Sequence, residues 1–271
     1  MPENERCRLD RCLVERGLAG GREKAKELLA AGFVTVNGVP VTKPSTLVGE
    51  TDTVVCTAPR PQYVGRGGLK LEKVLSDAVS PRGCVCMDVG ASTGGFTDCM
   101  LQHGAAHVYA VDVGHDQLHP SLRADKRVTA LEGTDVRSEA LRQTVPAGTV
   151  DFVSVDVSFV SLAHILPDVV PFLRPGATVV CLIKPQFEAG QSGIGKKGIV
   201  KDPAVHRRVL DAVCALFARL RLSLCALTYS PITGGEGNIE YLAVLCAADQ
   251  PPVPVVPADV VAEAFARLRA K

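Results

Sequence analysis

Apolar positions in the first 58 residues recur first at helical spacing and then in alternation. Residues 7–17 and 21–32 each place apolar side chains three or four positions apart and end in glycine, which predicts two short helices. Residues 33–42 form two β runs joined at Asn37 and Gly38, a strong hairpin signal, and residues 52–58 add another short β run. The pattern therefore predicts a small α+β domain over residues 1–58.

Residues 59–68 separate this domain from the rest of the chain. Pro59 and Pro61 stiffen the stretch and glycines loosen its end, so we interpret it as a linker. A predicted helix at 69–78 then opens an alternation of helices with strands, the strands being expected at residues 84–90, 107–114, 127–133, 150–159 and 177–185. Such alternation predicts a parallel, doubly wound α/β sheet within a domain over residues 69–248.

The end of this region breaks the alternation. After a predicted helix at 204–221, strands at 222–232 and 239–247 follow each other with only a glycine-rich loop between them, so they must pair antiparallel. Five parallel strands ending in an antiparallel hairpin differ from the sheet of a typical dinucleotide dehydrogenase. Residues 249–271 are a proline-rich segment with a terminal amphipathic helix, which we expect either to pack on the body or to contact a partner.

Composition places the chain among folded proteins that do not cross a membrane. It has 271 residues, of which 46% are hydrophobic and 22% charged, and no apolar run reaches about 18 residues. Its ten cysteines are scattered through apolar runs without a signal peptide, which indicates reduced core residues and a cytoplasmic location. No Cys or His pairs stand at the matched spacing of a metal site, so no metal is predicted.

The strand predicted at residues 84–90 runs into a loop of small residues and then into a helix. Ligands of parallel α/β sheets lie at the carboxyl ends of the strands, so this loop predicts a cofactor site. Its glycines, Gly90, Gly94 and Gly95, do not match the G-x-G-x-x-G spacing that brings a backbone onto a pyrophosphate, which disfavours NAD and FAD. Asp88 would repel a pyrophosphate but suits the ammonium group of S-adenosylmethionine.

Two further carboxylates follow the next two strands. Asp112 is placed to accept hydrogen bonds from ribose hydroxyls, and Asp135 to accept one from an adenine amino group. Each carboxylate alone also fits a turn or a cap, but three at successive strand ends favour a nucleoside cofactor. The expected cofactor-binding residues are Asp88, Gly90, Ala91, Ser92, Thr93, Gly94, Gly95, Phe96, Asp112, Val113, Asp135, Val136 and Asp156.

Several motifs resemble one known family. Residues 8–38 are similar to the S-four-type RNA-binding domain, and "RGGLKLEKVL", "DVGASTGGFTD", "VYAVDVG" and "IKPQFE" resemble the TlyA family of ribosomal RNA 2′-O-methyltransferases. The motifs occur in the family's order between residue 6 and about residue 247. The resemblance implies a Rossmann-like, S-adenosylmethionine-dependent methyltransferase sheet related to the FtsJ enzymes, a small α+β RNA-binding domain, and methylation of cytidine ribose in ribosomal RNA of the 30S or 50S subunit, or of both.

The resemblance also implies a catalytic tetrad, which falls on Lys70, Asp156, Lys184 and Glu240. A ribose 2′-hydroxyl is a poor nucleophile, so its methylation needs a base and accurate positioning. Lys184 is our candidate base. A lysine accepts a proton only when it is neutral; burial and a neighbouring Lys70 favour that form, whereas Asp156 and Glu240 favour the charged one. The sequence leaves the protonation state of Lys184 open.

Positive charge is concentrated in the first 75 residues, which carry a net charge of +3 against −2 for the remainder. The expected RNA-binding residues are Arg6, Arg8, Arg11, Arg22, Lys24, Lys26, Lys43, Arg66, Lys196 and Lys197. The last two belong to residues 188–202, predicted to be a basic lid or else an ordinary solvated loop. Interleaved acidic residues fit an ion-paired helical face equally well, and only the family resemblance favours RNA.

Other functions stay open on the residues alone. A non-catalytic RNA-binding factor of ribosome assembly would keep the fold but lose tetrad residues, and none is lost. A pseudouridine synthase shares the N-terminal domain type but needs no such cofactor loop, and membrane lysis lacks a membrane segment. The leading hypothesis is therefore a cytoplasmic, monomeric ribosomal RNA methyltransferase.

Overall fold

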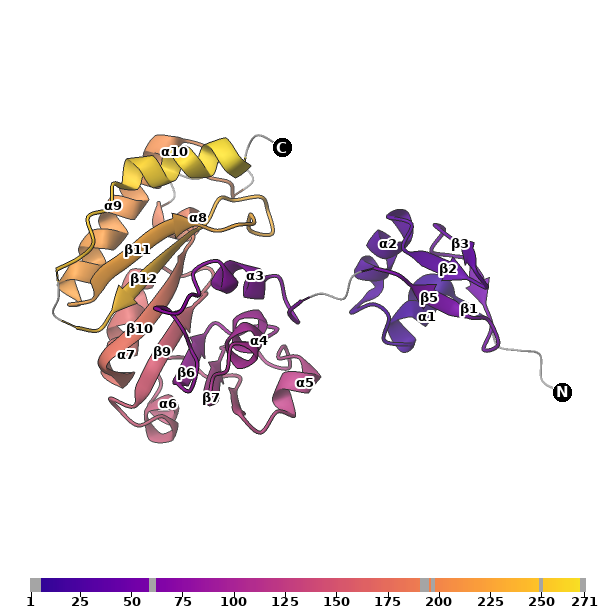
Figure 1. Cartoon of the computed structure of the whole chain (residues 1–271), viewed down its shortest axis with the longest axis horizontal. Helices are drawn as coiled ribbons and strands as arrows, with labels where there is room; N and C mark the ends of the chain where they lie inside the picture. Colours follow the sequence, from indigo (N-terminus) through magenta and orange to yellow (C-terminus); the bar gives the residue numbers. More distant parts are fainter. Residues whose placement is uncertain (1–5, 59–61, 191–194, 196–197, 249–250, 269–271) are drawn as a thin grey trace. The chain divides into compact units, whose positions relative to one another are not determined.

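The computed structural model describes residues 6–58, 62–190, 195, 198–248 and 251–268 (Figure 1). The chain divides into two compact units, residues 1–61 (unit 1) and residues 62–271 (unit 2). Unit 1 has its own hydrophobic core, and unit 2 has two apolar clusters. Each unit therefore buries apolar surface within itself.

Unit 1 packs two helices against short strands. In chain order its elements are β1 Cys7–Arg8, α1 Leu9–Glu15, α2 Arg22–Ala30, β2 Val34–Val36, β3 Val39–Pro40, β4 Leu47–Val48 and β5 Val54–Cys56. Asn37 and Gly38 form the two-residue turn of the β2–β3 hairpin with φ angles of 52° and 80°, in the left-handed region that such a turn requires. The two predicted helices and the hairpin are confirmed, whereas the antiparallel pairing of β1 with β4 has no counterpart in the prediction.

Unit 2 is built on one seven-stranded sheet. Its strands are β6 Val85–Val89, β7 His107–Val111, β8 Val128–Leu131, β9 Val150–Val155, β10 Leu173–Ile183, β11 Ser223–Tyr229 and β12 Tyr241–Cys246. They are ordered β11-β12-β10-β9-β6-β7-β8, and β12 alone runs against its neighbours. The five predicted parallel strands and the closing antiparallel hairpin are confirmed. The hairpin lies with β12 next to β10, so the start of β12 is brought beside the end of β10.

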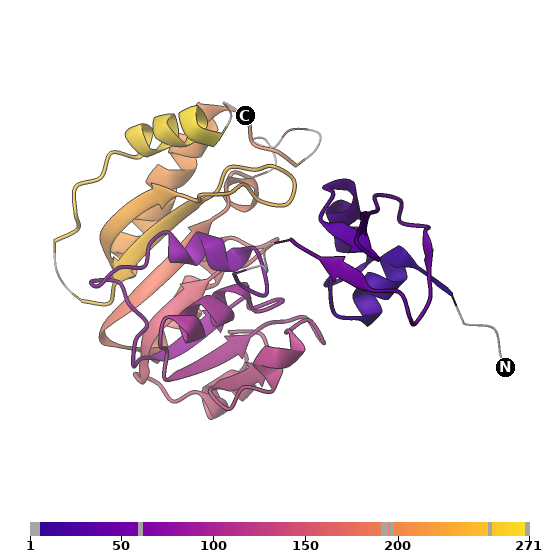
Figure 2. The same cartoon turned by 45° about the vertical axis from the view of Figure 1, so that its right-hand side comes forward.

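Helices cover both faces of this sheet. They are α3 Gly67–Glu72, α4 Gly95–Gln102, α5 Pro120–Arg123, α6 Glu139–Thr144, α7 Leu166–Val169, α8 Pro185–Glu188, α9 Pro203–Arg219 and α10 Pro257–Leu268, with 3-10 turns at Leu162–His164 and Val170–Phe172. Successive strand residues point to opposite faces of the sheet and join different apolar clusters. Cys86 belongs to the cluster that contains α4, and Met87 belongs to the cluster that contains α9 and α10. Figures 1 and 2 show α9 and α10 side by side, and α10 contacts β11 as well.

One predicted helix differs in extent from the structure, and the packing of another is now defined. The helix expected at 69–78 is α3, which begins at Gly67 and ends at Glu72, because the chain turns at residues 73–79 through reciprocal bonds between Ser76 and Val79. The C-terminal helix packs on the body, with Val261 and Ala264 buried. No helix in the described ranges is long and apolar enough to cross a membrane.

Candidate active site

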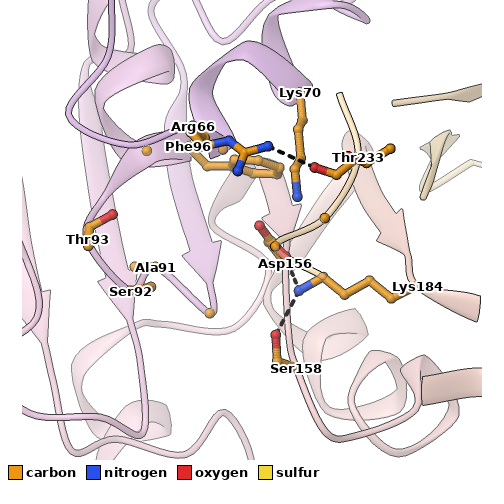
Figure 3. Close-up of a pocket in the computed structure, with 15 residues that line it drawn as sticks. Arg66, Lys70, Ala91, Ser92, Thr93, Phe96, Asp156, Ser158, Lys184 and Thr233 are labelled. Atoms are coloured by element: carbon orange, nitrogen blue, oxygen red, sulfur yellow. Dashed lines mark hydrogen bonds and ion pairs between the residues drawn. The ribbon is translucent and has the colours of Figure 1, made fainter. Parts of the chain in front are cut away.

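A cavity of about 320 Å³ lies where β6, β9 and β10 end, which is the sheet edge predicted to hold the site (Figure 3). Its walls come from α3, from the loop after β6, from the ends of β9 and β10, and from the loop before β12. The lining residues are Arg66, Gly67, Lys70, Gly90, Ala91, Ser92, Thr93, Gly95, Phe96, Asp156, Ser158, Lys184, Thr233, Gly234 and Gly235.

Glycines allow the cavity walls to approach one another closely. Gly90 has a φ of 86°, and a Cβ atom there would lie 2.5 Å from the carbonyl oxygen of Asp156. Gly95 opens α4, where a Cβ atom would lie 3.0 Å from the carbonyl oxygen of Gly65. Side chains at these two positions would push the loop away from β9 and α3 away from α4.

Lys184 and Asp156 form the first of two ion pairs at the cavity. Lys184 follows the last residue of β10, Asp156 follows the last residue of β9, and these two strands are parallel neighbours. Nζ of Lys184 lies 2.6 Å from Oδ1 of Asp156 and donates a hydrogen bond of 2.8 Å to Oγ of Ser158. The two side chains are 10% and 19% exposed, so the pair has little water around it.

Lys70 and Glu240 form the second pair, across 170 residues of sequence. Glu240 precedes β12, whose first residue Tyr241 pairs with Ile183 at the end of β10, so Glu240 reaches the same sheet edge as Lys184. Nζ of Lys70 in α3 donates to Oε2 of Glu240 at 2.6 Å, with side-chain exposures of 11% and 3%. The structure thus brings all four predicted tetrad residues together, and Figure 3 shows the amino groups of Lys70 and Lys184 directed toward Asp156.

One atom of the tetrad lacks a hydrogen-bonding partner. Oδ1 of Asp156 is buried and, within the described part of the chain, accepts no hydrogen bond; its contact with Lys184 is ionic. Buried carboxylate oxygens in folded proteins are normally hydrogen-bonded. The 2.6 Å ionic contact with Nζ of Lys184 therefore compensates the burial of this oxygen.

Asp88 lies behind the cavity and does not line it. Its carboxylate is fully buried and accepts hydrogen bonds from the hydroxyls of Thr97 at 2.7 Å and Ser154 at 2.8 Å. Burial raises the pKa of this carboxyl to about 6, although the hydrogen bonds from Thr97 and Ser154 lower it. The structure therefore differs from the predicted contact with a ligand ammonium, because Asp88 is a strand residue whose side chain points under α4.

Asp112 shapes the cofactor loop from the next strand end. Its Oδ2 accepts from the backbone N–H of Ser92, and its Oδ1 from that of Gly114, both at 2.7 Å. Ser92 adopts a φ of 48°, which is unusual for a residue other than glycine. Asp112 therefore holds the 90–93 turn in place while remaining half-exposed itself.

The other residues predicted to bind the cofactor are more widely spread. Asp135 pairs with Arg137 at 2.6 Å, and the hydrogen bond from that guanidinium lowers the pKa of the carboxyl. Val136 is buried in the core, and Val113 is 68% exposed. Of the predicted loop residues, Gly94 does not line the cavity; it precedes α4 with a φ of 93°, and a Cβ atom there would lie too close to the side chain of Leu122.

The basic residues of unit 1 mostly have acidic partners. Arg8 and Arg22 both pair with the buried Asp10, while Arg11 pairs with Glu15, Lys24 with Glu27 and Lys26 with Glu23. Arg6 and Lys43 are exposed. The five ion-paired cations, from Arg8 to Lys26, keep between 44% and 69% of their side-chain surface exposed to water, so the ion pairs leave them accessible.

Near the cavity, Arg66 lines the wall and donates to the carbonyl oxygen of Thr233 at 3.0 Å. Lys196 and Lys197 lie outside the described residues, as does part of the predicted lid.

The sequence did not point to five of the residues that line the cavity, namely Gly67, Ser158, Thr233, Gly234 and Gly235. Ser158 bonds Lys184, and Phe159 beside it is 90% exposed with a φ of 64°. The ring of Phe159 lies 5.0 Å from that of Phe187. Ser158 and Phe159 follow Asp156 by two and three residues, past the end of β9, whereas the predicted strand at 150–159 included both.

Known families match both units. Residues 63–246 match the FtsJ-like methyltransferase family, and residues 7–54 match the S4 domain. YqxC of Bacillus subtilis is 48% identical over 236 residues, which cover 87% of this chain and 84% of YqxC. The 16S/23S rRNA (cytidine-2′-O)-methyltransferase TlyA of Mycobacterium tuberculosis is 44% identical over 239 residues, covering 87% and 88% of the two chains. A solved structure described as a hemolysin from Streptococcus thermophilus is 42% identical, with a TM-score of 0.76 and 98% coverage of both chains.

Proposed function

The chain belongs to the FtsJ-like methyltransferases and shares their S4-bearing TlyA branch, and from this membership we propose that it methylates the ribose 2′-hydroxyl of a cytidine in ribosomal RNA. The observation that carries the proposal is the convergence of two buried lysine–carboxylate pairs on one cavity whose opposite wall is the glycine loop after β6. Such an arrangement suits the deprotonation and positioning of a hydroxyl.

The residues on the cavity wall fit S-adenosylmethionine, which when bound supplies a methyl group on a sulfonium centre. Gly90 keeps the loop open where a Cβ atom would fill the space, and the loop residues Ala91, Ser92 and Thr93 line the cavity beside it. We propose that the backbone of residues 90–93 holds the cofactor. We also propose that Asp112 gives up its hydrogen bond with the backbone N–H of Ser92 and accepts hydrogen bonds from the ribose of the cofactor instead. Asp88 supports this wall from behind.

Lys184 is our candidate for the group that takes the proton. In its neutral form, Nζ accepts the proton from the 2′-oxygen while the methyl group is transferred, and Asp156 at 2.6 Å stabilises the resulting ammonium. Lys70 is held by Glu240, and its positive charge then stabilises the negative charge that develops on the oxygen. The two carboxylates fix the directions of the two ammonium groups.

Unit 1 is proposed to deliver the RNA. Its exposed cations contact phosphates, which sets position rather than sequence, while the exposed Phe159, next in sequence to the cavity-lining Ser158, offers a face on which an unstacked base can lie. We further propose that the protein acts as a monomer in the cytoplasm, on the 30S subunit, the 50S subunit or both.

The test is methyl transfer from labelled S-adenosylmethionine to purified 30S and 50S subunits, followed by mass spectrometry of the nucleosides. We expect 2′-O-methylcytidine with the wild-type chain, and a loss of at least about 10²-fold in rate with Lys184→Ala. Lys126→Ala, which removes an exposed lysine outside the cavity, serves as the matched control and keeps the wild-type rate. Wild-type protein that binds subunits without methylating them would instead support the non-catalytic assembly factor.

A further inference from the structure

Ser158 contacts the candidate base directly. It lies two residues after Asp156, just past the end of β9, and lines the cavity. Its Oγ accepts a hydrogen bond of 2.8 Å from Nζ of Lys184, the same nitrogen that lies 2.6 Å from Oδ1 of Asp156 (Figure 3). Within the described residues these are the two polar partners of Nζ, and both come from one segment of chain.

A second contact changes what Lys184 can do. Lysine carries its amino group on a flexible four-carbon stem, so a single ion pair sets the distance to the carboxylate but leaves the amino group free to swing around it. A hydroxyl on the other side of Nζ removes that freedom. The remaining tetrahedral direction at Nζ is then defined, which is the condition for in-line proton transfer.

The loop that carries Ser158 is fastened independently. Glu188, four residues after Lys184 in α8, accepts hydrogen bonds from Oγ of Ser161 at 2.6 Å and from the backbone N–H of Leu162 at 2.8 Å. The loop after β9 and the segment after β10 are therefore joined at two places, once through Lys184 and Ser158 and once through Glu188. Two links prevent the rotation that a single link would allow.

We propose that Ser158 is a positioning residue for Lys184, and that Glu188 holds the loop of Ser158 against α8 so that this contact is kept during turnover. The inference rests on the proposed methyl transfer and adds two residues to the four of the tetrad. Neither residue takes up the proton; both act through Lys184.

The test compares Ser158→Val with Ser158→Thr, which have nearly the same shape but differ in the hydroxyl. Single-turnover rates are measured with saturating S-adenosylmethionine and ribosomal subunits. We expect Ser158→Val to lower the rate by about tenfold to a hundredfold, and Ser158→Thr to stay within about threefold of wild type. Calorimetry with S-adenosylmethionine should give unchanged affinity for both variants, and Ser76→Ala, an exposed turn serine, is the control that keeps full activity.

The pH dependence of the rate separates positioning from mere packing. A hydrogen bond to Ser158 is stronger from an ammonium than from a neutral amine, so its loss favours the neutral form of Lys184. The acid limb of the pH–rate profile should move to lower pH in Ser158→Val but not in Ser158→Thr. The other charged groups around the cavity, namely Asp156 after β9, Lys70 with Glu240, and Arg66, are unchanged in both variants, as is Glu188 in α8.

The proposed role of Glu188 in holding the loop of Ser158 is tested with a double variant. If Glu188 acts by holding Ser158, Glu188→Ala lowers the rate, and the Ser158→Val/Glu188→Ala protein is no slower than the slower single variant. Additive losses would assign Glu188 a separate role and overturn that half of the inference. A wild-type rate in Ser158→Val with an unmoved acid limb would overturn the other half, whereas a wild-type chain that transfers no methyl group to ribose would overturn the proposed function itself.

Discussion

Among the described residues each unit buries one aspartate completely, and the two carboxyl groups have opposite surroundings. In unit 1, Asp10 accepts hydrogen bonds from the guanidinium groups of Arg8 and Arg22, which hold the pKa of its carboxyl well below the usual range. In unit 2, Asp88 has neutral donors, namely the hydroxyls of Thr97 and Ser154 and the backbone N–H of Thr97, so burial prevails and raises its pKa to about 6. Burial alone therefore does not decide the charge of a carboxyl group; the charge of its donors does.

The same difference extends to the cations of the two units. Arg8 and Arg22 remain 47% and 61% exposed although they hold a buried acid, whereas Lys70 and Lys184 are only 11% and 10% exposed. Cations that stay in water can exchange an acidic partner for a phosphate. Cations withdrawn from water act more strongly on a reacting group, because the local dielectric is lower. Unit 1 is thus suited to binding and unit 2 to chemistry.

The largest effect on stability is expected where both partners are buried. Glu240→Ala leaves the Lys70 ammonium without its carboxylate and should lower the free energy of unfolding of unit 2 by about 3–5 kcal/mol. Replacing both partners, as in Lys70→Met/Glu240→Leu, should recover most of it. The four tyrosines all lie in unit 2 and the chain has no tryptophan, so tyrosine fluorescence in a urea titration reports this unit alone.

Asp211→Ala is the matched control for that experiment. It breaks an ion pair with Arg207 whose two side chains are 65% and 52% exposed, so it should cost less than about 1 kcal/mol. Equal losses in Glu240→Ala and Asp211→Ala would mean that the cavity pair is as well solvated as a surface pair.

Asp88 should make unit 2 less stable as the pH rises. Because its pKa is raised from 3.8 to about 6, its contribution is fully present below the unfolded value and is lost as the pH passes through about 6. Between pH 5 and pH 7.5 this loss amounts to about 1–2 kcal/mol. Asp88→Asn should remove it, as measured by urea titrations of tyrosine fluorescence at both pH values; an identical pH dependence in the variant would refute the assignment.

Asp10 should give unit 1 the opposite dependence. A lowered carboxyl pKa contributes stability above the ordinary value near 3.8 that is lost as the pH falls below it. Since both arginines are exposed and screened by salt, we expect a loss of only about 1 kcal/mol between pH 6 and pH 3. Hydrogen exchange of unit 1 amides, corrected for intrinsic rates, measures this, and Asp10→Asn should flatten the response. A unit 1 that becomes more protected in acid would contradict the comparison.

The smallest effect on stability is expected for an exposed pair. Lys24→Ala should change the unfolding free energy by less than about 0.5 kcal/mol. If Lys24 contacts a phosphate of the ribosomal subunit, the slope of log affinity against log salt concentration should fall by about 1. A slope that stays at the wild-type value would assign Lys24 to an ion-paired, solvated face.

Much of the fold could be predicted because its local signals agree. The strands of unit 2 are apolar runs bounded by glycine and charged residues, and Asn37-Gly38 marks the hairpin of unit 1. The pairing of β1 with β4 could not be predicted, because two-residue strands have no period and their partners lie about 40 residues apart. The end of α3 was also misplaced, since reciprocal turn bonds at Ser76 and Val79 leave no composition signal.

The residues of the candidate site also fall into those that local sequence could predict and those that it could not. The sequence by itself determined which residue types stand at the strand ends: the glycine loop after β6, Asp156 after β9 and Lys184 after β10. Parallel strands bring their ends to one edge whatever the packing, so these residues could be placed together in advance. Family resemblance assigned the tetrad as a set, and it alone supplied Lys70 and Glu240, which no local pattern links.

Only the tertiary structure decided which polar groups face the cavity and which face the core. Asp88 and Asp156 belong to neighbouring strands and both stand near a strand end, yet one lies under α4 and the other lines the site. That outcome depends on where each strand stops relative to the helix that covers it. Ser158 meets Lys184 for the same reason, because contacts between residues distant in sequence are set by how the layers pack and not by local preference.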